Sequence, residues 1–265
     1  MAALQPLHVA ALALVLVVCF PDGVAGGKKS MVDVDTAAEF RTTVRRQDGN
    51  VLTLSMSDEF TEDGRTFSKG EDSVFEAANK PDDTNQAIQY YNASSKYVRT
   101  EDGALVIETR AEPTMWEQWD ADTYQVTQHM KPYTSGMVQS WNKFCFTGGV
   151  LELSVQLPGT WDSAGVWPAA WLMGNLARAG YQTSTMHMWP WSYDQCRMPQ
   201  DTYLPDKQEI NACDADPGFG MRPGHGRGAP EIDIFEVMPG HDMPGQGFLD
   251  GIASTSLQGG RHAHA

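Results

Sequence analysis

Cysteine is scarce in this chain: four occur in 265 residues, at positions 19, 145, 196 and 213. Their spacing does not match a zinc site, so we predict no metal centre. Basic residues are also few, because 19 Lys and Arg stand against 34 Asp and Glu, a formal net charge of −15. This charge balance disfavours nucleic acid as a partner. Internal repeats and long helical patterns are absent too, which leaves short strands and turns as the main pattern.

Long hydrophobic runs are missing as well. Residues 9–20 are apolar, but they fall short of the roughly 20 residues that cross a bilayer. Small residues suited to cleavage follow at 24–26. We therefore predict a signal peptide over residues 1–26, export through the secretory pathway and a location outside the cell or in the cell wall. The flank before the run lacks Lys and Arg, so a short uncleaved signal anchor, associated with a membrane, is the alternative.

Alternation of apolar and polar residues predicts an all-β fold. Residues 27–50 are mixed and polar, and we interpret them as a linker with a short helix at 36–45. Period-two alternation then begins at residues 51–56 and returns at 151–157. Between them, Glu101, Asp102 and Gly103 predict a hairpin turn. Short strands separated by turns favour a β-sandwich.

The segment Glu231-Ile232-Asp233-Ile234-Phe235-Glu236 carries the clearest chemical signal. Glu231 and Asp233 share one face of a strand, whereas Glu236 is out of phase by one residue. A β-bulge at Ile234 and Phe235 would bring all three acids to one face, with Ile232 anchored in the core. Two carboxylates facing one sugar carry out glycoside hydrolysis. The alternative is a surface strand with scattered acids.

This segment and an ordered set of others resemble glycoside hydrolase family 16, the β-glucanase sandwiches. The resemblance covers roughly residues 54–240, and several stretches are closer to the fungal-type β-glucan synthesis-associated branch. It implies a concanavalin A-like β-jelly-roll sandwich and a retaining mechanism. It also supports Glu231 as nucleophile, Glu236 as acid/base and Asp233 as their assistant. The segments are residues 57–60 (SDEF), 58–67, 135–149, 157–159 (LPG), 167–171 (WPAAW), 173–176 (MGNL), 178–181 (RAGY) and 226–230 (GRGAP).

The same resemblance sets the expected domain. Residues 51–265 would form its N-terminal part, with an insertion at about 174–229 that favours the synthesis-associated branch. In the family many core strands follow the acid strand, whereas 29 residues follow Glu236 here and 259–265 show no strand pattern. We therefore expect a domain truncated at its C-terminus and inactive alone.

Four residues are candidates for substrate binding. Trp167 and Trp171 would share a strand face about 13 Å apart, enough to stack sugars at separate subsites. Trp141 and Asn142 precede a predicted strand and would project into the cleft. For all four, ordinary core packing is the alternative.

Three further expectations concern modification. Cys196 and Cys213 flank a loop rich in Pro, Asp and Gly, so we predict a disulfide between them. Cys145 alternates with Phe144 and Phe146, which predicts a buried free thiol. Asn92 begins a glycosylation sequon. Catalysis requires no cofactor, while structural calcium and the oligomeric state stay open.

The leading hypothesis is an exported enzyme that acts on β-glucan by a retaining mechanism, in the assembly or remodelling of cell-wall β-1,6-glucan. One alternative is a degradative endo-1,3-β-glucanase. A second is a non-catalytic glucan-binding protein or an inactive fragment. Whether water or another sugar accepts the glycosyl group cannot be inferred from these residues.

Overall fold

The computed structural model describes residues 31–45, 48–82, 84–120, 123–159, 165–175, 179–180, 229–238 and 252–258, and the backbone of residues 12–17. Contacts divide the chain into two units: residues 1–80 with 89–159, and residues 81–88 with 160–265. The described part is all-β apart from two short 3-10 helices, which confirms the predicted fold class. Within that part, no helix is long and apolar enough to span a membrane.

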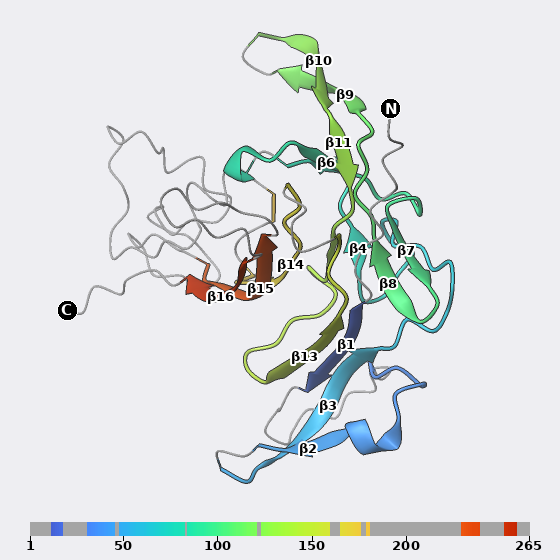
Figure 1. Ribbon diagram of the computed structural model, residues 1–265, viewed down its shortest axis with the longest axis vertical. Helices are drawn as coiled ribbons and strands as arrows, with labels where there is room; N and C mark the ends of the chain where they lie inside the picture. The colour runs from blue at the N-terminus through green and yellow to red at the C-terminus, as the bar shows by residue number, and fades with distance from the viewer. Residues whose placement is uncertain are drawn as a thin grey trace, which may run out of the picture. The chain divides into compact units, whose positions relative to one another are not determined.

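Most described elements belong to the first unit (Figure 1). They are β1 (Leu12–Val17), η1 (Ala38–Phe40), β2 (Thr42–Val44), β3 (Val51–Asp58), β4 (Glu76–Ala77), β6 (Gln89–Tyr91), β7 (Val98–Glu101), β8 (Ala104–Ile107), β9 (Thr114–Asp120), β10 (Gln125–Lys131), β11 (Tyr133–Ser135), β12 (Val138–Gln139) and β13 (Val150–Val155). Strand β5 (Lys80–Pro81) ends where the second unit begins. The second unit contains η2 (Thr84–Gln86), β14 (Ala169–Met173), β15 (Glu231–Met238) and β16 (Ile252–Gln258).

The largest sheet of the first unit has the strand order β13-β1-β3-β2. Strand β1, from the segment assigned to the export signal, pairs antiparallel with both β13 and β3. The signal itself stays a prediction. Residues assigned to the linker also belong to the packed structure, because β2 pairs with β3 and Thr36 is buried. In the structure, ordered packing therefore begins before residue 51.

The predicted strands of the first unit are confirmed. Leu52, Leu54 and Met56 are buried along β3 and alternate with more exposed residues. Strand β13 alternates in the same way. Strands β7 and β8 form the predicted hairpin, whose turn residues Asp102 and Gly103 both have positive φ. A two-residue turn with this backbone matches the twist of the strands that it joins.

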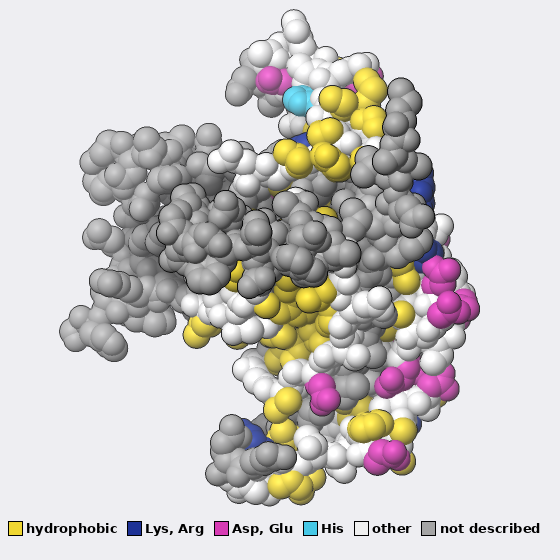
Figure 2. Space-filling view, in the orientation of Figure 1, with side chains coloured by type: hydrophobic (Ala, Val, Ile, Leu, Met, Phe, Trp, Pro, Cys, Tyr) yellow, Lys and Arg dark blue, Asp and Glu magenta, His cyan; other side chains and the backbone are white. Residues whose placement is uncertain are grey.

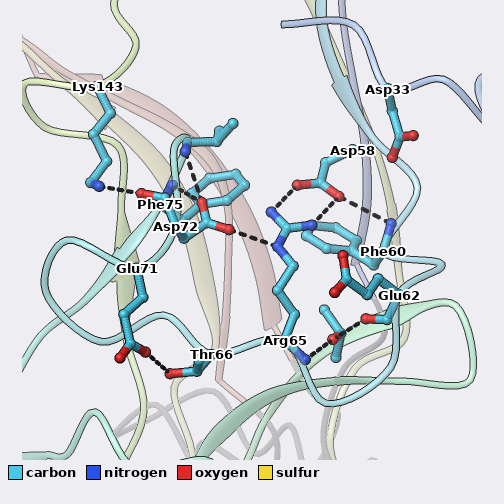
Figure 3. Close-up of polar contacts among 12 residues, drawn as sticks. Asp33, Asp58, Phe60, Glu62, Arg65, Thr66, Glu71, Asp72, Phe75 and Lys143 are labelled. Atoms are coloured by element: carbon cyan, nitrogen blue, oxygen red, sulfur yellow. Dashed lines mark hydrogen bonds and ion pairs between the residues drawn. The ribbon is translucent and has the colours of Figure 1, made fainter.

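Arg65 is the polar centre of this unit (Figure 3). Its guanidinium donates two hydrogen bonds to Asp58, and its Nε donates one of 2.6 Å to Asp72. Both carboxylates are almost fully buried. The guanidinium also lies 5.7 Å from the ring centroid of Phe60 and 5.2 Å from that of Phe67. One cation thus forms ion pairs with two buried anions inside the aromatic core.

Asp72 connects this cluster to the surrounding loops. Its Oδ1 accepts hydrogen bonds from the amides of Val74, at 2.7 Å, and Phe75, at 2.6 Å. Lys143 donates a hydrogen bond to its carbonyl oxygen. Burial alone would raise the pKa of the Asp72 carboxyl, but the hydrogen bonds from Arg65 and the two amides outweigh burial and lower it.

One prediction about this unit is wrong. Cys145 is a free thiol, as expected, but it is exposed rather than buried. Residues 144–146 form an irregular segment, not a strand. Phe144 and Phe146 stack on each other with ring centroids 6.0 Å apart and pack against the core, so Cys145 is left outside. Cys196 and Cys213 lie outside the described residues, and their disulfide stays a prediction.

The second unit contains an antiparallel sheet with the strand order β14-β15-β16 (Figure 1). Strand β16 was not identified from the sequence, although its residues alternate in burial. The amide of Gly174, just after β14, donates a 2.8 Å hydrogen bond to the carbonyl oxygen of Pro230, just before β15. A Cβ at Gly174 would lie only 2.8 Å from Pro230 Cδ, so this close approach requires glycine.

Candidate active site

The predicted β-bulge is present in β15. On the β14 side, Phe235 pairs with Ala170 and Asp233 pairs with Trp171, which leaves Ile234 as the extra residue. The register with β16 shifts at the same place, between Asp233 and Glu236. Because partners directly opposite each other in an antiparallel pair share a face, this register determines where each acid points.

All three carboxylates lie on one face of the sheet. Glu231, Asp233 and Glu236 pair with Met173, Trp171 and Ala169 of β14, which are alternate residues of one strand. The same three acids pair with Gln258, Ser256 and Ser254 of β16, again alternate residues. The bulge therefore corrects the phase of Glu236, as the sequence predicts. We call this surface the acid face.

The opposite face differs from the prediction. Ile232 was expected in the core, but its side chain is 44% exposed, and its partner Leu257 is 68% exposed. Burial on this sheet is greater at Asp233, which is 3% exposed, and at Val237, which is 9% exposed. Pairing with β14 and β16 in the plane of the sheet does not bury a side chain that stands on its face; burial there requires a second layer packed on that face.

Glu236 has the electrostatic environment of a proton donor. Its pKa is raised, first by burial and second by the negative charge of Asp233. A hydrogen bond from the Trp167 side chain acts in the opposite direction but does not cancel these effects. Trp167, which is half exposed just before β14, therefore contacts the carboxyl group that the sequence analysis assigned as acid/base.

Asp233 is held by residues that the sequence analysis missed. Ser256 Oγ donates a 2.6 Å hydrogen bond to Asp233 Oδ2. Gln258 Nε2 in turn donates a 3.0 Å hydrogen bond to Ser256 Oγ. A buried carboxylate needs such donors, because an unsatisfied buried charge is costly. The polar residues at every second position of 254–258 are a strand signal that could have revealed this relay.

Other predicted site residues fall in different places. Trp171 lies on the acid face, opposite Asp233. Trp141 and Asn142 belong to the first unit, in a turn where Trp141 is exposed and Asn142 has a φ of 60°. Their binding role stays a prediction. Asn92 also belongs to the first unit, and its Oδ1 accepts a 2.9 Å hydrogen bond from the amide of Ser94.

Among the residues that the structure describes, no group of three or more His, Cys, Asp or Glu side chains is placed to hold a metal ion. A hollow of about 210 Å³ does occur, on β9 and β10 of the first unit. We place the candidate active site on the acid face rather than at this hollow. The acid face combines three carboxylates, one of which, Glu236, has a raised pKa, whereas the hollow has one carboxylate.

Comparison with known proteins identifies the family of the chain. Residues 21–261 match the family model described as beta-glucan synthesis-associated protein SKN1/KRE6/Sbg1. Beta-glucan synthesis-associated protein KRE6 of Candida albicans is 38% identical over 240 residues, which cover 87% of this chain and 30% of that protein. Beta-glucan synthesis-associated protein SKN1 of Saccharomyces cerevisiae is 38% identical over 245 residues, which cover 87% of this chain and 28% of that protein. No solved structure matches.

The chain therefore spans about three tenths of the length of these curated relatives. The family match extends beyond both ends of the region that the sequence resemblance covers, and it includes the acid strand and β16. It confirms the resemblance drawn from the sequence. The chain belongs to the SKN1/KRE6/Sbg1 family of beta-glucan synthesis-associated proteins.

Proposed function

We propose that this chain carries the active site of a retaining enzyme that acts on β-glucan during cell-wall glucan synthesis. The observation that carries the proposal is the bulge in β15, which places three carboxylates on one face and leaves one of them with a raised pKa. The names of its relatives support β-glucan as the substrate class and glucan synthesis as the process. Export to the cell surface, with or without membrane association, is part of the same proposal.

Each acid has a separate role. Glu231 attacks the anomeric carbon and forms a glycosyl-enzyme intermediate while the leaving sugar departs. Glu236 donates its proton to the leaving oxygen, and its raised pKa keeps that proton available. It then accepts a proton from the incoming hydroxyl group, which attacks the same carbon and releases Glu231. Asp233 stabilises the protonated form of Glu236 through its negative charge.

The aromatic residues beside the acids suit a sugar substrate. Trp171 is on the acid face and Trp167 hydrogen bonds to Glu236, so both indoles belong to the surface that a glucan chain would cover. An indole presents a flat apolar face to the C–H groups of a pyranose ring. We propose both as substrate-binding residues.

Product analysis tests the proposal. The purified protein is incubated with β-1,3-glucan and, separately, with β-1,6-glucan, and the products are followed by NMR and chromatography. Retention requires the new anomeric centre to be β at first formation. Transfer to an acceptor sugar gives longer chains, whereas hydrolysis gives short sugars and would favour the degradative alternative. An α product would overturn the retaining mechanism, and binding without turnover would favour the non-catalytic alternative.

Ser256→Ala tests the link between Asp233 and Glu236. Without the Ser256 hydroxyl, the Asp233 carboxylate is no longer held beside Glu236. The repulsion between Asp233 and the ionised form of Glu236 then weakens, so the pKa of Glu236 falls. Glu236 must be protonated to act, and activity is lost as pH rises through its pKa. The alkaline limb of the kcat/KM profile should therefore move to lower pH. The rate should fall by roughly 10- to 150-fold, because a hydrogen bond to a charged group contributes about 1.5–3 kcal/mol.

The charged groups facing Glu236 on this sheet are Asp233 and Glu231 of its own strand, since its described neighbours on β14 and β16 are uncharged. Ser256→Thr keeps a hydroxyl group and should restore the profile. Thr255→Ala, at the exposed neighbouring position, is the matched control. An alkaline limb that does not move in Ser256→Ala would contradict the proposed relay.

A further inference from the structure

The β9–β10 hairpin of the first unit has two chemically distinct faces. Its register pairs Trp116 with His129 on one face. The neighbouring pairs therefore lie on the other face, because side chains alternate along a strand. We call this second surface the outer hairpin face. It consists of the pairs Met115–Met130, Glu117–Gln128 and Trp119–Val126.

The first face anchors the hairpin. Trp116 stacks on His129, with ring centroids 5.5 Å apart and an angle of 20° between the rings. Tyr90 of β6 packs on the same indole at 5.3 Å. These ring contacts join the hairpin to β6 of its own unit, on the face opposite the outer hairpin face.

The outer hairpin face exposes an unusual amount of apolar surface. Met115 is 68% exposed, Trp119 58%, Met130 57% and Val126 56%. Tyr124, at the turn, is 76% exposed and packs edge-on against Trp119 at 6.4 Å. Figure 2 shows the hairpin at the top of the view with hydrophobic side chains beside a histidine, so this view includes the anchored face, and the outer hairpin face is defined by the strand register. Exposed apolar side chains grouped on one hairpin in this way are typical of a binding site.

A polar pair interrupts this apolar surface at its centre. Gln128 Nε2 donates a hydrogen bond of 3.5 Å to Glu117 Oε1, a long distance that leaves both groups able to bind other partners. A hollow of about 210 Å³ adjoins this pair; Met115, Glu117 and Gln128 of the outer hairpin face line it together with Trp116 of the anchored face. That volume is below the range of about 300–1,000 Å³ for drug-sized ligands.

We propose that the outer hairpin face is a second, non-catalytic binding site for a β-glucan chain. Naming glucan as the ligand rests on the function proposed above; the site itself rests on the hairpin. Trp119 and Tyr124 offer aromatic surface to the C–H faces of sugar rings, and Glu117 and Gln128 offer an acceptor and a donor to a hydroxyl group. A glucan has this alternation of apolar ring faces and equatorial hydroxyl groups.

Charge on the hairpin argues against a membrane as the occupant. An anionic membrane surface attracts clusters of Lys and Arg. The described residues of β9 and β10 carry Glu117 and Asp120 but only one such cation, Lys131. A neutral polysaccharide needs no complementary charge, so this composition suits a glucan chain better than a lipid headgroup.

The test measures binding separately from turnover. In a Glu231→Ala background, which prevents consumption of the ligand, affinity electrophoresis in gels containing β-1,3-glucan or β-1,6-glucan compares the parent with Trp119→Ala. Loss of the exposed indole should weaken retention about tenfold, as expected for one aromatic stacking contact. Gln118→Ala, exposed on the anchored face of the same hairpin, should leave retention unchanged. Circular dichroism confirms that each variant is folded.

Three results would overturn the proposal: equal retention of folded Trp119→Ala, a dimer in sedimentation that Trp119→Ala dissociates, or flotation with neutral lipid vesicles that Trp119→Ala abolishes. The last two would identify a second copy or a membrane as the occupant. If retention depends on Trp119 but the protein with Glu231 unchanged shows no turnover, the result would support this binding site and reject the catalytic proposal. If the protein shows turnover but its retention does not depend on Trp119, the result would support the catalytic proposal and reject this binding site.

Discussion

Under the proposed retaining mechanism, Glu231→Ala is expected to abolish glucan turnover, with a loss on the order of 10⁴-fold or more, because the glycosyl-enzyme intermediate would no longer form. Glu236→Ala should cost roughly 10²–10⁴-fold, the usual contribution of a general acid. Both acids are only partly buried, and substitution to Ala leaves the β15 ladder intact. Rates on β-1,3- and β-1,6-glucan oligosaccharides measure the effect. Glu39→Gln, an exposed acid in η1, is the control and should keep full activity.

Azide distinguishes the two roles. In Glu231→Ala the small anion can occupy the space of the missing carboxylate and attack the anomeric carbon from that side, which gives an α-glycosyl azide. In Glu236→Ala the glycosyl-enzyme still forms, so azide attacks from the other side and gives a β-glycosyl azide. NMR of the products identifies the configuration. A β-azide from Glu231→Ala would reverse the assignment, and full activity of that variant without azide would reject it.

Arg65→Met is expected to destabilise the first unit by about 3–5 kcal/mol or more, because it leaves the buried carboxylates of Asp58 and Asp72 without their cation. A loss of that size is a large part of the ~5–15 kcal/mol by which domains are stable. Urea unfolding followed by circular dichroism measures the effect. If Arg65→Met does not fold, its yield of soluble protein is compared with that of the parent protein, and unfolding is measured on Arg65→Lys instead. Arg65→Lys keeps the positive charge but loses the forked geometry, so its free energy of unfolding should lie between those of Arg65→Met and the parent protein.

The matched control is Arg45→Met, which breaks the exposed ion pair with Asp48. That change should cost less than about 1 kcal/mol. Acid sensitivity provides a second readout, because the pKa of Asp72 is lowered in the folded state. Its contribution is complete above the unfolded value of about 3.9 and is lost as pH falls through the lower folded value. Equal stability of Arg65→Met and the parent protein would contradict this account.

Much of the local structure could be predicted because it depends on neighbours in the chain. Alternation along β3 and β13 follows from the two-residue period of a strand, and the turn at Asp102 and Gly103 follows from local backbone preferences. The bulge at Ile234 was predictable for the same reason, since only one extra residue brings Glu236 into phase with Asp233.

What the sequence determined alone was therefore the all-β class, the family and the three acids. The tertiary structure decided which side chains meet those acids. The Trp167 side chain donates a hydrogen bond to Glu236. Ser256 of β16 donates one to Asp233, which lies 23 positions away in the chain. The tertiary structure also leaves Cys145 and Ile232 exposed, whereas local alternation had predicted both to be buried. The physical reason is that burial and hydrogen-bond partners depend on which distant strands pack together, and a periodic pattern carries no information about which strands those are.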